Sequence, residues 1–241
     1  MRWCLYTIVL TVAFRGTALS TEIAGAPRFV DGDTIEIGTS KIRLEAIDSP
    51  EPDQLCLDHE GKRWTCGIEA RDRLIQKAGG KVWMCRTNSN DLYGRALATC
   101  EVEGTNINRW MVREGWALSF VRYSHEYDRD ELAARQANAG LWSGAFIAPW
   151  DWRSRTKNPV ILGAGSVPKD AQPILLSAAS AVDAPTPGCT IKGNMNRNGE
   201  CIYHMPGDRF YSALKMNLSK GKRWFCTEAE AEAVGCRRSK N

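Results

Sequence analysis

Residues 30–35 read Val-Asp-Gly-Asp-Thr-Ile, and residues 42–51 read Ile-Arg-Leu-Glu-Ala-Ile-Asp-Ser-Pro-Glu. Apolar and polar residues alternate beyond the Asp-Gly turn, which is the period of paired β-strands with one buried face. The apolar positions of these strands are Ile35, Ile37, Ile42 and Leu44. Pro50 cannot donate a ladder hydrogen bond and disfavours a helical Ser49, so the segment 48–51 is predicted to lie in a loop beyond the strand. Acidic residues therefore gather where the chain leaves the sheet, and such loops commonly carry functional sites.

Two of these carboxylates, Asp33 and Asp48, are candidate ligands of a hard cation such as Ca²⁺, which prefers oxygen donors. The alternative is that Asp31-Gly32-Asp33 is only a turn, because Asp and Gly are common turn residues. A second segment, Asp91-Leu-Tyr-Gly-Arg95, favours a site. Arg43 and Arg95 are forked cations of the kind that binds phosphate.

Several motifs in register resemble the staphylococcal-nuclease (thermonuclease) family over residues 27 to 153. They are Val30-Asp-Gly-Asp-Thr34, Arg43-Leu44 with Ile47-Asp-Ser-Pro-Glu51, Asp91-Leu-Tyr-Gly-Arg95, Ile107-Asn108 before Met111-Val-Arg-Glu-Gly-Trp-Ala117, and Gly140-Leu-Trp142. The resemblance implies an α+β fold with a five-stranded OB-type β-barrel capped by three helices. Short strands, hairpins and intervening helices favour the same architecture.

The resemblance also implies a Ca²⁺-dependent phosphodiesterase that cleaves DNA and RNA and leaves 5′-hydroxyl and 3′-phosphate ends. It implies that Asp33, Asp48 and the backbone carbonyl of Ser49 bind Ca²⁺. By the same resemblance Glu51 orients or deprotonates the attacking water, while Arg43 and Arg95 clamp the phosphate. Ser49 stands where the family commonly has Thr, a change of small effect if only its carbonyl coordinates. No residue of this set reads base edges, so we expect little sequence specificity.

The pattern predicts a helix at 68–78, strands at 82–85 and 96–102, and further helices at 106–114 and 130–138. Tyrosines near the expected site are candidate substrate contacts, because aromatic rings stack on bases. They are Tyr93 and Tyr123, with Tyr127 close by. For Tyr123 and Tyr127, packing against Trp142 is the alternative.

The chain has 241 residues, of which 43% are hydrophobic, and a formal net charge of +4. The charge is +2 over residues 1–20, −3 over 21–187 and +5 over 188–241. The expected nuclease domain is therefore slightly acidic. Its affinity for nucleic acid must come from a local arginine cluster or from the basic end of the chain.

Residues 1–20 combine a basic start, an apolar run and small residues before position 21, which indicates a secretory signal peptide. A disordered start or a buried helix are the alternatives. The apolar run is too short to span a bilayer. We therefore expect a periplasmic or secreted monomer with no stable membrane insertion after signal removal.

Without Cys4, eight cysteines remain, an even number that fits full pairing in an oxidising compartment. Cys56 and Cys66 flank a short polar loop, and Cys85 and Cys100 are placed symmetrically about Leu92–Tyr93. Both pairs are predicted disulfides, and closing the 56–66 loop stabilises by about 2–3 kcal/mol on the chain-entropy model. Buried free thiols are the alternative.

Composition divides the remainder of the chain. We expect a thermonuclease domain at 21–154, a flexible Ala/Ser/Pro/Gly-rich linker at 155–187 and a small basic module at 188–241. The module contains Cys189, Cys201, Cys226 and Cys236. It has no Cys-x-x-Cys spacing, so two disulfides of undetermined connectivity are favoured over a zinc site.

A second function class is a catalytically inactive OB-fold protein of the cell envelope that binds nucleic acid or an anionic polymer. Its expected signature is the loss of a metal carboxylate or of a phosphate-binding arginine. None of these residues is missing here. The sequence therefore favours the enzyme.

Overall fold

Residues 34–44 form a β-hairpin, as the alternation of apolar and polar residues predicts. In the computed structural model, β3 (Thr34–Ile37) pairs antiparallel with β4 (Ser40–Leu44), with Ile35 opposite Ile42. The reversal lies at Gly38–Thr39, and the Asp31-Gly32 turn precedes β3. The structure describes residues 21–163, 168, 170–178, 189–196, 200–217 and 220–240. The predicted signal peptide lies outside these residues.

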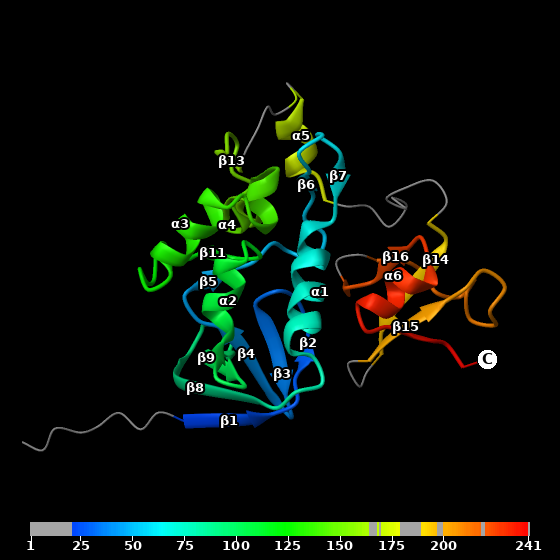
Figure 1. Cartoon of the computed structure of the whole chain (residues 1–241), viewed down its shortest axis with the longest axis horizontal. Coiled ribbons are helices and arrows are strands. Elements are labelled where there is room, and N and C mark those ends of the chain that lie inside the picture. The colour runs from blue at the N-terminus through cyan, green and yellow to red at the C-terminus, as the bar shows by residue number, and fades with distance from the viewer. Residues whose placement is uncertain are drawn as a thin grey trace, which may run out of the picture.

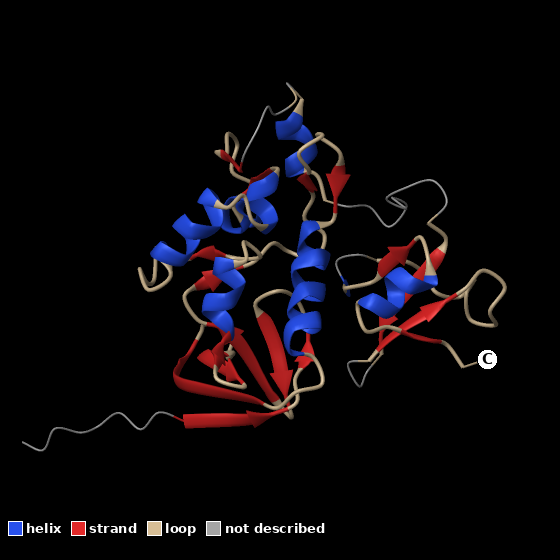
Figure 2. Ribbon diagram, in the orientation of Figure 1, coloured by secondary structure: helices blue, strands red, loops and turns tan. Residues whose placement is uncertain are grey.

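The main sheet runs in the order β1-β8-β9-β4-β3-β2, with β10 also paired to β9. The β4–β9 pair is parallel and the other pairs of this sheet are antiparallel. Its remaining strands are β1 (Thr21–Gly25), β2 (Arg28–Phe29), β8 (Trp83–Asn90), β9 (Ala96–Val102) and β10 (Thr105–Asn106). The sheet lies at one end of the domain, and helices pack on the side of it that faces the rest of the domain (Figure 2).

The expected helices are present with shifted ends. They are α1 (Cys66–Ala78), α2 (Ile107–Arg113) and α3 (Asp128–Gln136). The structure adds the 3-10 turn η1 (Gly140–Ser143), α4 (Pro149–Ser154) and α5 (Ala171–Leu176). An OB-like half-barrel sheet with helices is therefore confirmed. The expected count of five strands and three capping helices is not, because the sheet takes up the added strands β1 and β2 and short helices follow α3.

Two smaller sheets complete the domain. β5 (Ile47–Asp48) pairs with β11 (Leu118–Ser119), which fixes Asp48 against Leu118. The other sheet has the order β13-β12-β6-β7. Its strands are β6 (Cys56–Leu57), β7 (Arg63–Trp64), β12 (Ala145–Ile147) and β13 (Ile161–Gly163).

The apolar core lies between the main sheet and the helices. Ile35, Ile42 and Leu44 from the hairpin are fully buried, and they share one cluster with Leu74 of α1 and Trp83 of β8. A buried large aliphatic side chain contributes about 1.5–3 kcal/mol. The β3–β4 hairpin, which lies between Asp33 and Asp48 in the chain, is thus anchored in the core.

The stretch 155–187 was expected to be a flexible linker, and its described part differs from this. β13 pairs with β12, and Leu175 of α5 is buried in a cluster with Leu57 and Trp152. The reason is that the apolar run Ile174-Leu175-Leu176 finds an open apolar surface on β6 and β12. The domain boundaries otherwise stay a prediction.

The C-terminal module forms its own sheet, ordered β16-β14-β15-β17, beside a short helix. Its elements are β14 (Ile191–Met195), β15 (Cys201–His204), β16 (Arg223–Phe225), α6 (Glu228–Ala233) and β17 (Arg237–Arg238). The module lies beside α1 (Figure 1). There Arg223 forms ion pairs with Glu69 and Asp72 of α1.

All eight cysteines after Cys4 are paired. The bridges Cys56–Cys66 and Cys85–Cys100 confirm the predicted pairs, and the latter joins directly opposed residues of β8 and β9. The module has Cys189–Cys226 and Cys201–Cys236, which settles the connectivity that the sequence left open.

Candidate active site

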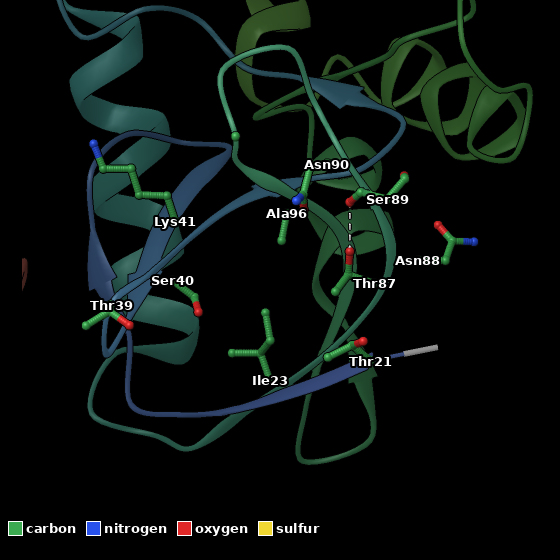
Figure 3. Close-up of a pocket in the computed structure, with 11 residues that line it drawn as sticks. Thr21, Ile23, Thr39, Ser40, Lys41, Thr87, Asn88, Ser89, Asn90 and Ala96 are labelled. Carbon is green, nitrogen blue, oxygen red and sulfur yellow. Dashed lines mark hydrogen bonds between the residues drawn. The ribbon is translucent and has the colours of Figure 1, made fainter. Parts of the chain in front are cut away.

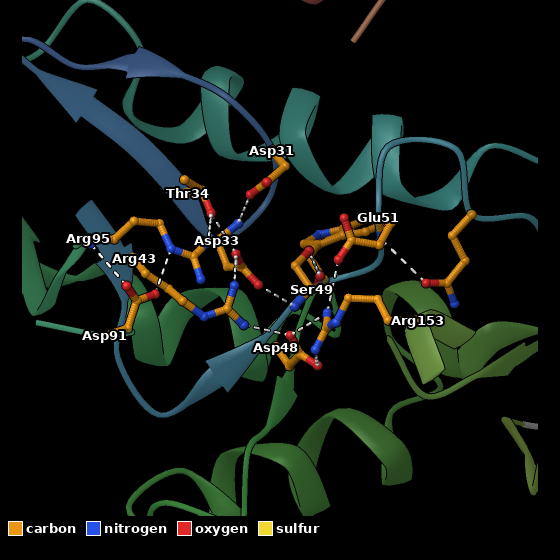
Figure 4. A network of polar contacts seen from close by, with 12 residues as sticks. Asp31, Asp33, Thr34, Arg43, Asp48, Ser49, Glu51, Asp91, Arg95 and Arg153 are labelled. Atoms are coloured by element: carbon orange, nitrogen blue, oxygen red, sulfur yellow. Dashed lines mark hydrogen bonds and ion pairs between the residues drawn. The ribbon is translucent and has the colours of Figure 1, made fainter. Parts of the chain in front are cut away.

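Arg43 of β4 bridges the two acidic turns (Figure 4). Its Nη1 donates to Asp33 Oδ1 and its Nη2 to Asp48 Oδ1, each at 2.7 Å. This is possible because Arg43 lies opposite Thr34 in the hairpin, next to Asp33. The carboxylate of Asp33 raises the pKa of Arg43 despite burial. The predicted ligands Asp33 and Asp48 therefore face one guanidinium.

Arg95 approaches the same cluster from the 91–95 turn. Its Nη1 donates to Thr34 Oγ1 at 3.4 Å, and this hydroxyl donates to Asp33 Oδ1 at 3.0 Å. Its Nε is held by Asp91 Oδ2 at 2.7 Å. Arg95 thus lies on the same side of the sheet as Asp33 (Figure 4).

Ser49 is turned so that its hydroxyl faces the protein. Its N–H donates to Asp33 Oδ2 and its Oγ donates to the carbonyl oxygen of Trp116, both at 2.9 Å. A Cβ at Gly32 would lie 2.1 Å from Ser49 Oγ. This close approach explains why the turn before β3 contains glycine.

Glu51 sits in a loop that is fixed through Gln54. The Glu51 N–H donates to Gln54 Oε1 at 3.3 Å, and Gln54 Nε2 donates to the carbonyl oxygen of Ile147 at 2.8 Å. A Cβ at Gly67, in the first turn of α1, would lie 1.8 Å from the Glu51 carbonyl oxygen. Buried Gln54 and Gly67 therefore set the position of the Glu51 backbone.

Asp31, Asp48 and Glu51 have raised pKa values. Burial, followed by the nearby Asp33 carboxylate, raises the pKa of Asp31 to about 8. Burial also raises the pKa of Asp48 and of Glu51, although Arg153 opposes both shifts. An elevated carboxyl pKa suits a group that accepts a proton near neutral pH.

The donor chemistry of this cluster fits a hard divalent cation. The Asp33 carboxylate raises the pKa of Asp31, Asp48 and Glu51, and the guanidinium groups of Arg43 and Arg153 act in the opposite direction. Four carboxyl groups share these two guanidinium groups, which leaves an excess of negative charge when all four are ionised. Among the described residues, no three His, Cys, Asp or Glu side chains already stand in a metal-holding arrangement. Oxygen donors with this excess charge are those that Ca²⁺ prefers.

The predicted tyrosine contacts separate into two environments. Tyr93 and Tyr123 are 86% and 75% exposed, and Tyr93 lies beside Arg95, whose Cζ is 5.6 Å from the ring centroid. The Tyr123 ring packs against Phe120 in a T-shaped pair with ring centroids 4.9 Å apart, and not against Trp142 as the alternative had it. Tyr127 is fully buried in the core, so a base cannot stack on its ring and that prediction is wrong.

A groove of about 530 Å³ lies elsewhere, between β1, the start of β4 and the bulged end of β8. Threonine, serine and asparagine side chains line it together with Lys41 (Figure 3). It contains none of the predicted site residues. The acidic cluster is therefore not part of this groove.

Three residues of the cluster were not among the predicted site residues. Arg153 bonds to Asp48 and Glu51 from 102 residues beyond Glu51, a contact that no local pattern signals. Gln54 was an ordinary polar residue in a loop. Asp31 was considered only as a turn residue, and its position two residues before Asp33 was the available signal.

The family model described as staphylococcal nuclease homologue matches residues 41–144. An uncharacterized endonuclease of Escherichia coli is 34% identical over 159 residues, which cover 62% of this chain and 97% of that protein. The chain belongs to the staphylococcal nuclease family. The micrococcal nuclease of Shigella flexneri is 32% identical over 149 residues, or 54% of this chain and 80% of that protein.

Another relative of this chain has a name that does not mention a nuclease. The succinoglycan biosynthesis protein ExoI of Rhizobium meliloti (strain 1021) is 32% identical over 123 residues, which are 50% of this chain and 64% of that protein. The family match begins at residue 41 and so includes Arg43, Asp48, Glu51 and Arg95. Asp33 precedes the matched residues, and its place in the site rests on the geometry described above.

Proposed function

We propose that this chain is a Ca²⁺-dependent phosphodiesterase that hydrolyses DNA and RNA without sequence preference and leaves 3′-phosphate ends. A thermonuclease-type hydrolase is what membership of the family supports, together with relatives named endonuclease and micrococcal nuclease. The observation that carries the finer proposal is the meeting of Arg43 and Arg95 with the acidic turns at Asp33 and Asp48. The two arginines come from different segments of the chain, and their guanidinium groups lie near the same carboxylates.

In this proposal Asp33, Asp48 and the Ser49 carbonyl hold the cation. When bound, Ca²⁺ supplies positive charge beside the phosphodiester and lowers the cost of bringing an anion to a carboxylate cluster. Arg43 and Arg95 bind the phosphate oxygens through their forked N–H groups. Arg43 can do so only after releasing part of its hold on the two aspartates.

Glu51 is the proposed general base. Its side chain is 30% exposed, so water can reach it, and burial raises its pKa toward the range in which a carboxylate accepts a proton effectively. Exposed Tyr93 and Tyr123 are proposed to contact the bases or sugars of the substrate. The roles proposed for these residues involve the cation, the phosphate and water and not base edges, so we propose low sequence specificity.

The four disulfides are of the kind that persist in oxidising compartments, and they support export. Among the described residues, no helix has the length and apolar character needed to cross a bilayer. We propose that the protein is periplasmic or secreted and acts as a monomer.

The test is degradation of plasmid DNA and of RNA by the full chain in Ca²⁺ or in EGTA. We expect cleavage in Ca²⁺ only, with Glu51→Gln and Arg95→Ala each lowering the rate by about 10²–10³-fold. Arg129→Ala, which alters an exposed residue of α3, is the matched control. Intact substrate in every lane, with retained nucleic-acid binding, would support the inactive binding protein instead.

A further inference from the structure

Arg153 connects the end of the nuclease domain to its acidic cluster. Its Nη1 and Nη2 donate to Asp48 Oδ1 at 3.0 Å and to Asp48 Oδ2 at 2.8 Å. Nη1 also donates to Glu51 Oε1 at 3.0 Å. One guanidinium therefore neutralises a proposed metal ligand and the proposed base together (Figure 4).

The backbone that carries Arg153 is fixed. Helix α4 begins with Pro149 at its first turn, and Trp152 is 5% exposed in the cluster that it shares with α5. Trp150 stacks on Phe120 with ring centroids 5.3 Å apart, and the Phe120 N–H donates to the Ala46 carbonyl oxygen beside the acidic loop. These contacts thus fix the position of α4 relative to the acidic loop.

The head of the side chain is less confined than its base. The Arg153 side chain is 36% exposed, whereas that of Asp48 is fully buried. Rotation of the guanidinium toward solvent is therefore open to Arg153, and Asp48 has no such freedom. If a cation binds at Asp48, the arginine is the partner that can move.

We propose that Arg153 is a built-in counter-cation that occupies Asp48 and Glu51 in the calcium-free protein and competes with Ca²⁺ for them. This inference rests on the proposed Ca²⁺ site and deepens it. Like charges repel at close range, so a cation and the guanidinium weaken each other's hold on the same oxygens. Arg153 thereby lowers the Ca²⁺ affinity and keeps the carboxylates compensated when the ion is absent.

The test is a calorimetric Ca²⁺ titration of the full chain and of Arg153→Gln. We expect at least about tenfold tighter Ca²⁺ binding by Arg153→Gln, because one competing positive charge is gone. Arg153→Lys keeps the charge and should stay within about threefold of the wild type. Arg129→Gln removes an equal charge from an exposed position of α3 and should change the affinity less than about twofold.

Thermal unfolding provides a second readout that needs no catalysis. In EGTA, Arg153→Gln should unfold at a lower temperature than Arg129→Gln, and added Ca²⁺ should remove most of that difference, because the ion replaces the lost charge. Equal or weaker Ca²⁺ binding by Arg153→Gln would overturn the competition while leaving the Ca²⁺ site itself intact. Absence of Ca²⁺ binding by both proteins would refute the metal assignment and the competition together.

Discussion

The guanidinium of Arg71 on α1 donates through Nη1 to the carbonyl oxygen of Gly221 in the C-terminal module, at 2.7 Å and across 150 residues of chain. The same guanidinium pairs with Asp72, which also binds Arg223 of the module. The Arg71 and Asp72 side chains are each only 3% exposed. Buried charges that depend on one another across two folding units couple the stability of those units.

Replacement of Arg223 should therefore weaken the whole chain. Arg223→Ala leaves Asp72 with Arg71 as its partner and removes one of two positive charges from a buried site, so we expect a loss of about 1–3 kcal/mol in the free energy of unfolding. Urea denaturation measures it. Arg237→Ala breaks the exposed pair with Glu200 and should cost less than about 1 kcal/mol. Equal losses in both variants would show that the docking contact is not energetically special.

A methyl group at Gly67 should displace the Glu51 loop. The added Cβ would meet the Glu51 carbonyl oxygen at 1.8 Å, a distance that requires backbone movement. We expect Gly67→Ala to lower kcat by about tenfold or more, since a shift of about 1 Å in a positioned base has effects of that order. Steady-state kinetics on a short DNA measure this. Gly38→Ala, in a turn with open space around it, should keep kcat within about twofold of the wild type despite local strain.

The raised pKa of Asp31 predicts a pH-dependent stability. The unfolded carboxyl titrates near 3.8 and the folded one at about 8, so the folded protein holds a proton that the unfolded chain has lost. The free energy of unfolding should fall as the pH rises from about 4 to 8 in EGTA. Asp31 is partly exposed, which makes the slope shallower than a full shift would give. Asp31→Asn should flatten the slope in urea unfolding measured at several pH values, and an unchanged slope would contradict this assignment.

The same shift predicts that Ca²⁺ binding releases protons. A cation beside Asp31, Asp48 and Glu51 favours their ionised forms, so the Ca²⁺ affinity should rise between pH 5 and 8. Titrations in buffers of different ionisation enthalpy report the released protons. Asp31→Asn should release fewer of them, whereas Arg129→Gln should release the wild-type number.

Two disulfides of similar loop length should differ in their effect on activity. Replacing both cysteines of the Cys56–Cys66 or the Cys85–Cys100 pair by alanine should cost about 2–3 kcal/mol of stability in either case. The first bridge joins β6 to the start of α1, next to Gly67 and the Glu51 loop. We expect only its removal to lower kcat at a temperature where both variants are folded. Equal activity of the two variants would argue against this coupling.

Local patterns were sufficient for the parts of the site that the hairpin itself carries. Asp33, Arg43 and Asp48 lie on paired strands or at their ends, so alternation and turn chemistry predict that they meet. The position of Arg95 near the acidic residues was predicted from the loop that joins the two strands at 82–85 and 96–102. The positions of these side chains agree with the predictions because strand pairing fixes which residues face each other. Their roles in the site stay predictions.

Contacts between distant segments could not be predicted in this way. Arg153 reaches Asp48 only because α4 packs on α5 and on Phe120, and α5 lies in the stretch 155–187 that was expected to be a linker. The docking of Arg223 on Asp72 joins two units that composition separates. No periodic pattern in the sequence indicates either contact, since each depends on apolar packing elsewhere in the chain.

The Gln54 side chain hydrogen-bonds both the Glu51 N–H and the Ile147 carbonyl oxygen. This link limits how easily the site could be transferred to another protein. A transplant of residues 30–51 into another barrel would carry the acids and one arginine but would leave the base on an unsupported loop. A working graft must bring the strand at 145–147 as well, so the smallest transferable unit is most of the domain.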